Sequence, residues 1–373
     1  MAHPLHSPLR LAVLGSLAVV AISACGSDSD SGSATSSPAA TAASVAPASS
    51  AASVSTAVAD STTATSAAAG SDDSFDVAYL SASSANTWLT SSKAEIDKVA
   101  EANGVTVTEF DGQFDAALQT TQLQDIVSSG KYDGVVVVAI NGPGLIPDVE
   151  AAVAAGMQVV VLNQVLGTDL TTSDPQVTGV AASVMVPPKA SGTRLGELTK
   201  AACAKLDPCN VAFIYGIKGI PLDDAIREGF DETIADTATI KVVAEGEGKY
   251  LGPDGGITAT QTILQLGKDI NVIVGADQSI QGAAIELGSQ GVEGVRLIGV
   301  GGSEAAINGI TDGTWFGGVY GAPADEGRIA MEALLAAMKD GTVTGGIDPL
   351  ATLPDNGLIT ADNVAEFSAQ WAG

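Results

Sequence analysis

Short β-branched runs alternate with helical patterns through most of this chain, from Phe75 to the C-terminus. The run 135–138, four valines, lacks polar alternation, which is typical of parallel strands covered by helices on both faces. The spacing, roughly 20 to 30 residues, predicts an α/β fold with parallel sheets. The expected strands form two series: 76–81, 105–110, 134–140, 158–162 and 177–181, then 211–215, 240–245, 271–274, 296–300 and 316–320.

Apolar positions at helical spacing lie between these strands, as at Ile96, Val99 and Ala100. The expected helices are 91–103, 115–129, 190–204 and 325–340. A folded part of about 300 residues is more than one core comfortably holds, so we predict two similar doubly wound lobes with a cleft between them. Ligands bind outside the carboxyl ends of the strands in such sheets, so residues just after each strand are the candidates for a site.

The N-terminal segment is typical of a bacterial lipoprotein signal peptide. An uncharged apolar run, 11–22, follows Arg10 and leads to Ile22-Ser23-Ala24-Cys25. The run is shorter than the roughly 20 residues that a transmembrane helix needs. We therefore expect cleavage after residue 24, lipidation of Cys25 and attachment to the extracellular face of the cell membrane. A plain secretory signal with a chance cysteine is the alternative.

Residues 26–73 consist almost entirely of Ser, Ala, Thr, Asp and Pro. Such a segment cannot bury enough apolar surface to offset its ordering entropy, so we expect 25–73 to be a lipidated cysteine followed by a disordered tether. The tether would reach roughly 35 to 40 Å as a flexible coil.

The expected cleavage would remove both histidines, His3 and His6. Without imidazole, Ser–His and Cys–His nucleophile pairs and the commonest metal ligand are excluded. Carboxylate chemistry stays open, but no spacing among the 43 Asp and Glu singles out a pair. Phosphate-binding glycine motifs and a nucleophile elbow are absent from the sequence. We expect no enzymatic activity, no cofactor and no metal.

The cysteines and the net charge indicate a compartment for the protein and exclude one class of partner. Cys203 and Cys209 flank an Asp207-Pro208 step that can supply a turn, so we expect a disulfide in the exported protein, with two buried free thiols as the alternative. The formal net charge is −27. A nucleic acid would be repelled by that field, and the sequence has no basic stripe to overcome it.

A series of motifs resembles the sugar-type periplasmic binding proteins, the ribose-binding-like class that feeds ABC importers. The resemblance runs from about residue 76 to the C-terminus and rests on the order and spacing of segments 77–80, 86–88, 132–135, 140–143, 155–160, 227–230, 275–278 and 298–302. It implies a type 1 periplasmic binding protein fold whose lobes are joined by three crossovers, near 182–187, Ala322 and 347–349. Lobe one would comprise 74–183 plus 322–347, and lobe two 184–321 plus 348–373.

The resemblance also implies a set of ligand-binding residues. Asn86 and Trp88 match an Asn-Pro-Phe segment of the family, with Trp88 as the stacking ring. Asn141 matches the Asn after the third strand, and Tyr250 falls at an aromatic position of the second lobe. The full set expected to bind ligand is Asn86, Trp88, Asn141, Asn163, Gln164, Arg227, Tyr250, Asp277 and Tyr320.

Some of these positions depart from the family pattern. Asn163 and Gln164 replace a charged Asp-Arg pair, and Ile226 stands where an Arg is usual, with Arg227 one place along. Three further replacements are Ala276 for Asn, Gly301 for Asp, and Gly321 for Gln with Tyr320 beside it. We therefore expect a ligand that is larger, less hydroxylated or held through more aromatic contact than a pentose.

Five of the expected site residues also have a structural interpretation. Trp88 could be a core residue and Tyr250 a surface anchor. Asn141 and Asn163 could cap helices, and Asp277 could be a helix N-cap, because these residue types are favoured there.

Three functional hypotheses follow. The first is a monomeric, lipid-anchored receptor that captures a sugar-like molecule and delivers it to an ABC permease. The second is a surface carbohydrate hydrolase that uses carboxylates. The third is a sensor that serves a chemoreceptor or a quorum-signal uptake system.

Overall fold

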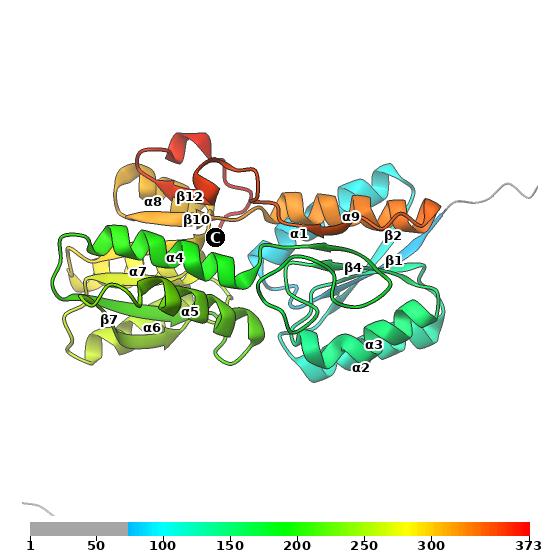
Figure 1. Cartoon of the computed structure of the whole chain (residues 1–373), viewed down its shortest axis with the longest axis horizontal. Coiled ribbons are helices and arrows are strands. Elements are labelled where there is room, and N and C mark those ends of the chain that lie inside the picture. The colour runs from blue at the N-terminus through cyan, green and yellow to red at the C-terminus, as the bar shows by residue number, and fades with distance from the viewer. Residues whose placement is uncertain (1–73) are drawn as a thin grey trace, which may run out of the picture. The chain divides into compact units, whose positions relative to one another are not determined.

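The computed structural model of this protein describes residues 74–373, which form two six-stranded sheets, each with helices on both faces (Figure 1). The expected signal peptide, Cys25 and the tether lie outside the described residues. We call the sheet built from β1 to β5 and β11, with its helices, lobe one. The sheet built from β6 to β10 and β12, with its helices, is lobe two.

Lobe one has the strand order β11-β5-β4-β3-β1-β2, and every neighbouring pair is parallel. Its strands are β1 (Asp76–Ser81), β2 (Thr106–Asp111), β3 (Gly134–Val137), β4 (Gln158–Leu162), β5 (Val180–Val184) and β11 (Gly345–Ile347). Its helices are α1 (Thr87–Ala102), α2 (Ala116–Ser129), α3 (Gly142–Ala154) and α9 (Pro323–Asp340).

Lobe two repeats this order as β12-β10-β9-β8-β6-β7, with β12 antiparallel to β10 and the other pairs parallel. Its strands are β6 (Cys209–Tyr215), β7 (Ile240–Glu247), β8 (Val272–Ala276), β9 (Arg296–Gly301), β10 (Gly317–Tyr320) and β12 (Leu358–Thr360). Its helices are α4 (Pro188–Cys203), α5 (Pro221–Ile234), α6 (Pro253–Gln265), α7 (Asp277–Gln290) and α8 (Glu304–Asp312). Two 3-10 turns, Pro354–Gly357 and Val364–Glu366, flank β12.

Both faces of each sheet are buried, which explains the unbroken valine runs. In lobe one, Val77 and Tyr79 of β1 face a cluster with α1 and α9, while Ala78 and Leu80 face α2 and α3. In lobe two, α4 and α5 cover one face of the sheet and α6, α7 and α8 cover the other. The predicted fold class of two α/β lobes with parallel sheets is confirmed.

The chain passes between the lobes three times. It leaves β5 of lobe one and enters α4, which packs on the sheet of lobe two. It returns from β10 to α9, which packs on β3, β4 and β5, and passes again from β11 to β12.

Some element ends differ from the predictions for local physical reasons. The strand expected at 177–181 is β5 at Val180–Val184, because Gly179 has a φ of 91° and interrupts the extended backbone. The strand expected at 134–140 ends at Val137, because the Gln119 side chain binds the backbone of Val138 and Ile140 in place of a neighbouring strand. Helix α1 begins at Thr87 rather than at residue 91, since Asn86 caps it.

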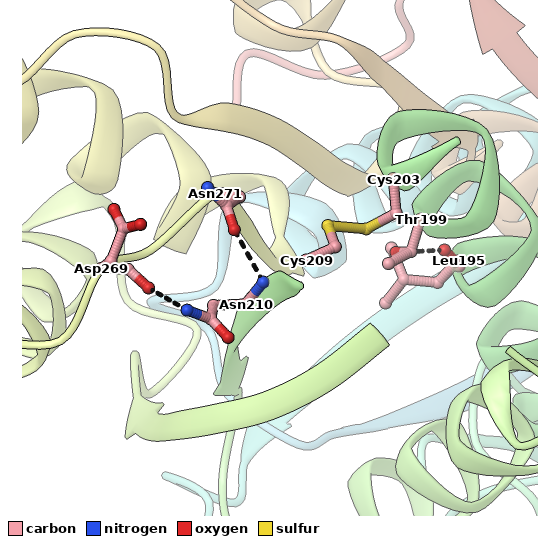
Figure 2. Close-up of a disulfide and its surroundings, with 7 residues drawn as sticks. All are labelled: Leu195, Thr199, Cys203, Cys209, Asn210, Asp269 and Asn271. Atoms are coloured by element: carbon pink, nitrogen blue, oxygen red, sulfur yellow. Dashed lines mark hydrogen bonds between the residues drawn. A yellow bond between two sulfur atoms is a disulfide. The ribbon is translucent and has the colours of Figure 1, made fainter. Parts of the chain in front are cut away.

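Cys203 at the end of α4 and Cys209 at the start of β6 are joined by a disulfide in the structure (Figure 2). Both half-cystines are buried in the core of lobe two. Next to them, the Asn210 amide N–H donates to Asn271 Oδ1 over 2.7 Å, and Asn210 Nδ2 donates to the Asp269 carbonyl over 2.8 Å. The disulfide therefore ties the end of α4 to the start of β6, which lies between β8 and the edge strand β7.

Within residues 74–373, no helix is both long and apolar enough to cross a membrane.

Candidate ligand-binding site

A cavity of about 130 Å³, which we call the interlobe pocket, is lined by residues of both lobes. Asn86 and Trp88 line it after β1, Gly216 after β6, and Gln278 after β8. The strand order reverses next to β1 in one sheet and next to β6 in the other, which is where open α/β sheets bind ligands. The polar and aromatic side chains of the lining include Asn86, Trp88, Phe114, Asn163, Gln164, Ser191, Phe213, Asp223, Tyr250, Gln278, Tyr320, Glu326 and Trp371.

Asn86 connects the two walls of the interlobe pocket. Its Oδ1 accepts from the Leu89 N–H over 3.0 Å and so caps α1. Its Nδ2 donates to the carbonyl of Tyr250, in lobe two, over 2.9 Å. The capping bond fixes the amide, and the second bond holds the lobes together at the edge of the pocket.

Glu326 of α9 is a buried carboxyl in the wall of the pocket, with 1% of its surface exposed. Trp88 Nε1 and Asn163 Nδ2 both donate to Glu326 Oε2, each over 3.2 Å. Asn163 reaches this oxygen from a left-handed backbone, φ 65°, which Asn adopts more readily than most residues. Burial raises the pKa of Glu326 to about 8, against the lowering effect of the two donors.

Tyr250 and Asp223 form the polar wall of lobe two. Tyr250 Oη donates to Asp223 Oδ1 over 2.9 Å, and the N–H groups of Gly216 and Ile217 donate to the same carboxylate over 2.7 and 3.0 Å. Burial raises the pKa of Asp223 to about 6 despite these donors. Burial, together with the neighbouring Asp223, also raises the pKa of Tyr250 well above its ordinary value.

The C-terminal segment supplies a further aromatic wall. Trp371 Nε1 donates to the Gly301 carbonyl over 2.8 Å, and its ring packs edge-on against Trp88 with 5.3 Å between centroids. A Cβ at Gly301 would lie 2.6 Å from the Trp371 ring, and one at Gly321 would lie 2.2 Å from the Trp88 ring. Two of the departures from the family pattern therefore make room for tryptophan rings.

The structure brings six of the nine expected site residues together in the pocket: Asn86, Trp88, Asn163, Gln164, Tyr250 and Tyr320. Tyr320 presents its ring there, while its hydroxyl donates to the Ser368 carbonyl over 2.7 Å.

Asn141 and Asp277 do not line the pocket. Asn141 is exposed and caps α3 through Gly144, at 3.4 Å. Asp277 is fully buried at the start of α7, and its Oδ2 accepts from the Ser303 N–H over 2.7 Å. Burial raises the pKa of Asp277 to about 6. Asn141 thus has the helix-capping role of its structural interpretation. Asp277 does not cap α7, whose N-cap is Ala276, and instead fixes the turn between β9 and α8.

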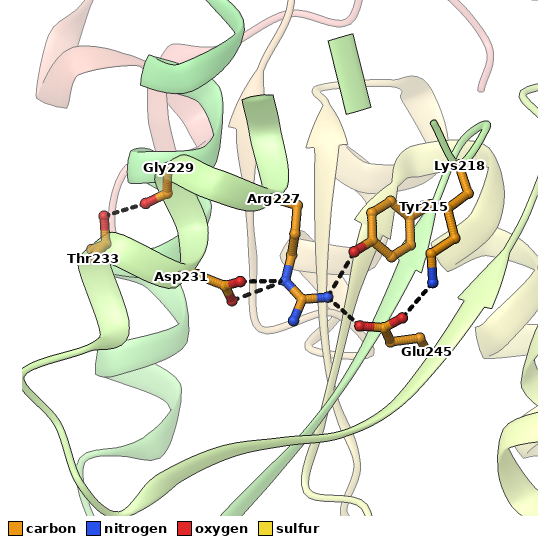
Figure 3. Close-up of polar contacts among 7 residues, drawn as sticks. All are labelled: Tyr215, Lys218, Arg227, Gly229, Asp231, Thr233 and Glu245. Carbon is orange, nitrogen blue, oxygen red and sulfur yellow. Dashed lines mark hydrogen bonds and ion pairs between the residues drawn. The ribbon is translucent and has the colours of Figure 1, made fainter. Parts of the chain in front are cut away.

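Arg227 does not line the pocket either, and Figure 3 shows its guanidinium between Asp231, Glu245 and Tyr215. Its Nε donates to both carboxylate oxygens of Asp231 over 2.9 Å, and its Nη1 donates to Tyr215 Oη and Glu245 Oε1 over 2.9 and 2.6 Å. Lys218 pairs with the second oxygen of Glu245 over 2.6 Å. Ile226, the preceding residue, lines the pocket instead. The guanidinium is thus engaged by lobe two itself.

Sequence reasoning missed Phe114, Asp223, Gln278, Glu326 and Trp371. A signal existed for Asp223 and Glu326, because both lie in the first turn of a helix that follows a strand at the ligand-binding edge. Trp371 gave no such signal, since only the folded chain shows that the C-terminus returns to the pocket.

Among the described residues, no group of three or more Cys, His, Asp or Glu side chains is arranged to hold a metal ion.

The sequence profile of the periplasmic binding protein domain family matches residues 77–342. This chain belongs to that family. The family predicted from the order of motifs is thereby confirmed.

The chain is similar to two curated relatives. The xylitol-binding protein of Mycolicibacterium smegmatis is 24% identical over 283 residues, which cover 75% of this chain and 75% of that protein. The ribose import binding protein RbsB of Bacillus subtilis is 26% identical over 252 residues, 66% of this chain and 76% of that one.

A solved structure shares the fold. It is a solute-binding protein of an ABC transporter from Mycobacterium smegmatis with bound glycerol, with a TM-score of 0.68 and 22% identity. The match covers 80% of this chain and 99% of that chain.

Proposed function

We propose that this protein is an extracellular solute-binding protein, anchored by a lipid at Cys25, that captures a small sugar or polyol and delivers it to an ABC permease. The main support for this proposal is the interlobe pocket. Its aromatic rings suit the C–H surface of a hydroxylated ligand, and its buried amides and carboxyls suit the hydroxyl groups. The names of two relatives, which specify xylitol and ribose, support the same ligand class.

Binding requires no chemical step. Trp88 and Glu326 belong to lobe one and Tyr250 to lobe two, so a ligand touches both walls only when the lobes are closed. A ligand that contacts both walls shifts the equilibrium toward the closed form. The Asn86–Tyr250 bond is available only in that form and adds to its stability. The permease would recognise the closed lobes.

The expected signal peptide and the cysteines support an extracellular location. Lipid at Cys25 would retain a monomeric protein at the outer membrane face, and the tether would hold the lobes clear of it. The Cys203–Cys209 disulfide suits an oxidising compartment.

The test is a thermal-shift screen of the purified full-length protein against sugars and polyols, followed by isothermal titration calorimetry of the hits. We expect one-to-one binding that Trp88→Ala weakens and that Tyr132→Ala, an aromatic change outside the interlobe pocket, leaves intact. No hit in the screen, or equal binding by the two variants, would refute the pocket as the site. Recovery of a chemically altered ligand would refute binding without turnover and favour the hydrolase.

Transport is tested separately in cells. Deleting the coding sequence should abolish uptake of the labelled ligand at low concentration, and uptake at the wild-type rate would contradict delivery to a permease.

A further inference from the structure

Glu326 contains the one carboxylate oxygen of the interlobe pocket that the protein leaves without a donor. Oε2 accepts from Trp88 and Asn163, whereas within residues 74–373 no group donates to Oε1. Asp223, the other carboxyl of the pocket, already accepts three hydrogen bonds. Oε1 is therefore the carboxyl oxygen of the pocket that is left free to bond a ligand.

The surroundings of Glu326 supply no positive charge. No lysine or arginine is among the described residues that line the pocket. Arg328, on the same helix, pairs with Asp325 and Glu332 at the surface. From the neighbouring elements, the Asp348 carboxylate acts unfavourably on the ionised Glu326, and Tyr79 of β1 is a buried neutral phenol.

Aromatic rings stand beside this carboxyl. The Trp88 indole touches Oε2, and the Trp371 ring packs on Trp88. The indole N–H of Trp88 points at the carboxyl, so this ring contributes a hydrogen bond and helps to shield Glu326 from solvent. The net charge of −27 also raises the local concentration of cationic over anionic solutes.

Resting on the proposed function, we propose that the ligand is an amine-bearing polyol or amino sugar whose ammonium group pairs with Glu326 Oε1 beside the Trp88 ring. A hydroxyl can share a hydrogen bond with the neutral carboxyl of Glu326, whereas an ammonium pairs with the ionised form, for which the pocket holds no cation. Charge-assisted hydrogen bonds are roughly twice as strong as neutral ones. A ligand that carries a carboxylate or phosphate would face Glu326 and Asp223 without a cation and is excluded.

The experiment compares ligands that differ only by amine for hydroxyl: xylitol and 1-amino-1-deoxyxylitol, sorbitol and glucamine, and glucose and glucosamine. Calorimetry on the full-length protein at pH 7 should show the amine member of the best pair binding about tenfold more tightly. Because an adjacent ammonium lowers the pKa of Glu326 from about 8, binding the amine should also release a proton. Titrations in two buffers of different ionisation enthalpy measure that release.

Two variants distinguish the effect of Glu326 on ligand binding from the effect of the protein's net charge. Glu326→Gln keeps an oxygen that can accept from Trp88 and Asn163, and should remove both the amine preference and the proton release. Glu332→Gln makes the same charge change on an exposed position of α9 and should preserve both.

The outcomes distinguish the two proposals. Hydroxyl members that bind as tightly as their amine partners, or amine binding without proton release, would overturn the amine inference and leave the proposed function standing. If no member of any pair binds, the proposed ligand class itself is refuted, and the inference with it.

Discussion

Replacing Glu326 by Gln should stabilise the ligand-free protein at alkaline pH. The carboxyl is 1% exposed, and burial raises its pKa from 4.5 to about 8. The folded state therefore binds the proton more tightly than the unfolded chain does. The stability that this proton contributes is fully present below pH 4.5, declines as the pH rises, and is lost above about pH 8.

The magnitude follows from the two pKa values. Each pKa unit corresponds to about 1.4 kcal/mol, so ionising Glu326 in the fold costs about 5 kcal/mol by pH 9 if the pocket does not relax. Gln cannot ionise, and its carbonyl can accept the bonds from Trp88 and Asn163. The variant should therefore lose less stability than the wild type as the pH rises, by several kcal/mol.

The assay is urea unfolding at pH 5 and at pH 9, without ligand, for the wild type, Glu326→Gln and Glu332→Gln. The side chain of Glu332 is 52% exposed, so its variant should follow the wild type. Equal losses in the wild type and Glu326→Gln between the two pH values would refute the assignment of a buried, unpaired carboxyl.

Three other changes test separate parts of the structure. Gly321→Ala places a Cβ 2.2 Å from the Trp88 ring, so it should lower the free energy of unfolding in urea by about 1–3 kcal/mol and weaken ligand binding. The control Gly288→Ala, with no atom within 4 Å of the new Cβ, should have neither effect. Replacing both cysteines of the Cys203–Cys209 disulfide by Ser should cost about 2 kcal/mol, measured by unfolding in oxidising buffer. Cys25→Ala should abolish palmitate labelling and release the protein into the medium; labelling of this variant would place the lipid elsewhere.

The fold was predictable because the apolar pattern reports burial directly. The valines of β3 and β4 are buried on both sides of the sheet, and no other arrangement of such runs with intervening helices is common. The ends of strands were less predictable. Gly179 and Gln119 act through a backbone angle and a long-range side-chain bond, which the pattern of apolar residues does not contain.

The candidate site was predictable where residues directly follow strands. Asn86, Trp88 and Asn163 come into the pocket because the carboxyl ends of parallel strands meet at one edge. Arg227 was expected in the pocket but does not line it, because consecutive residues of a helix point roughly 100° apart. Ile226 therefore lines the pocket, and Arg227 lies beside its acidic partners.

Other parts of the pocket depend on contacts between distant segments. Glu326 acquires its position only when α9 packs against α1, and Trp371 only when the C-terminus contacts β9. In the sequence, Gly301 and Gly321 indicated a site with fewer polar side chains than the family pattern has. The structure shows instead that tryptophan rings occupy the space beside both glycines.

A crystal structure of the full-length protein with the first ligand that the screen identifies would show whether the interlobe pocket is the binding site. We expect density for one ligand molecule in the interlobe pocket, in contact with Trp88 of lobe one and Tyr250 of lobe two. Density for the ligand at any other surface, with this pocket empty, would contradict it.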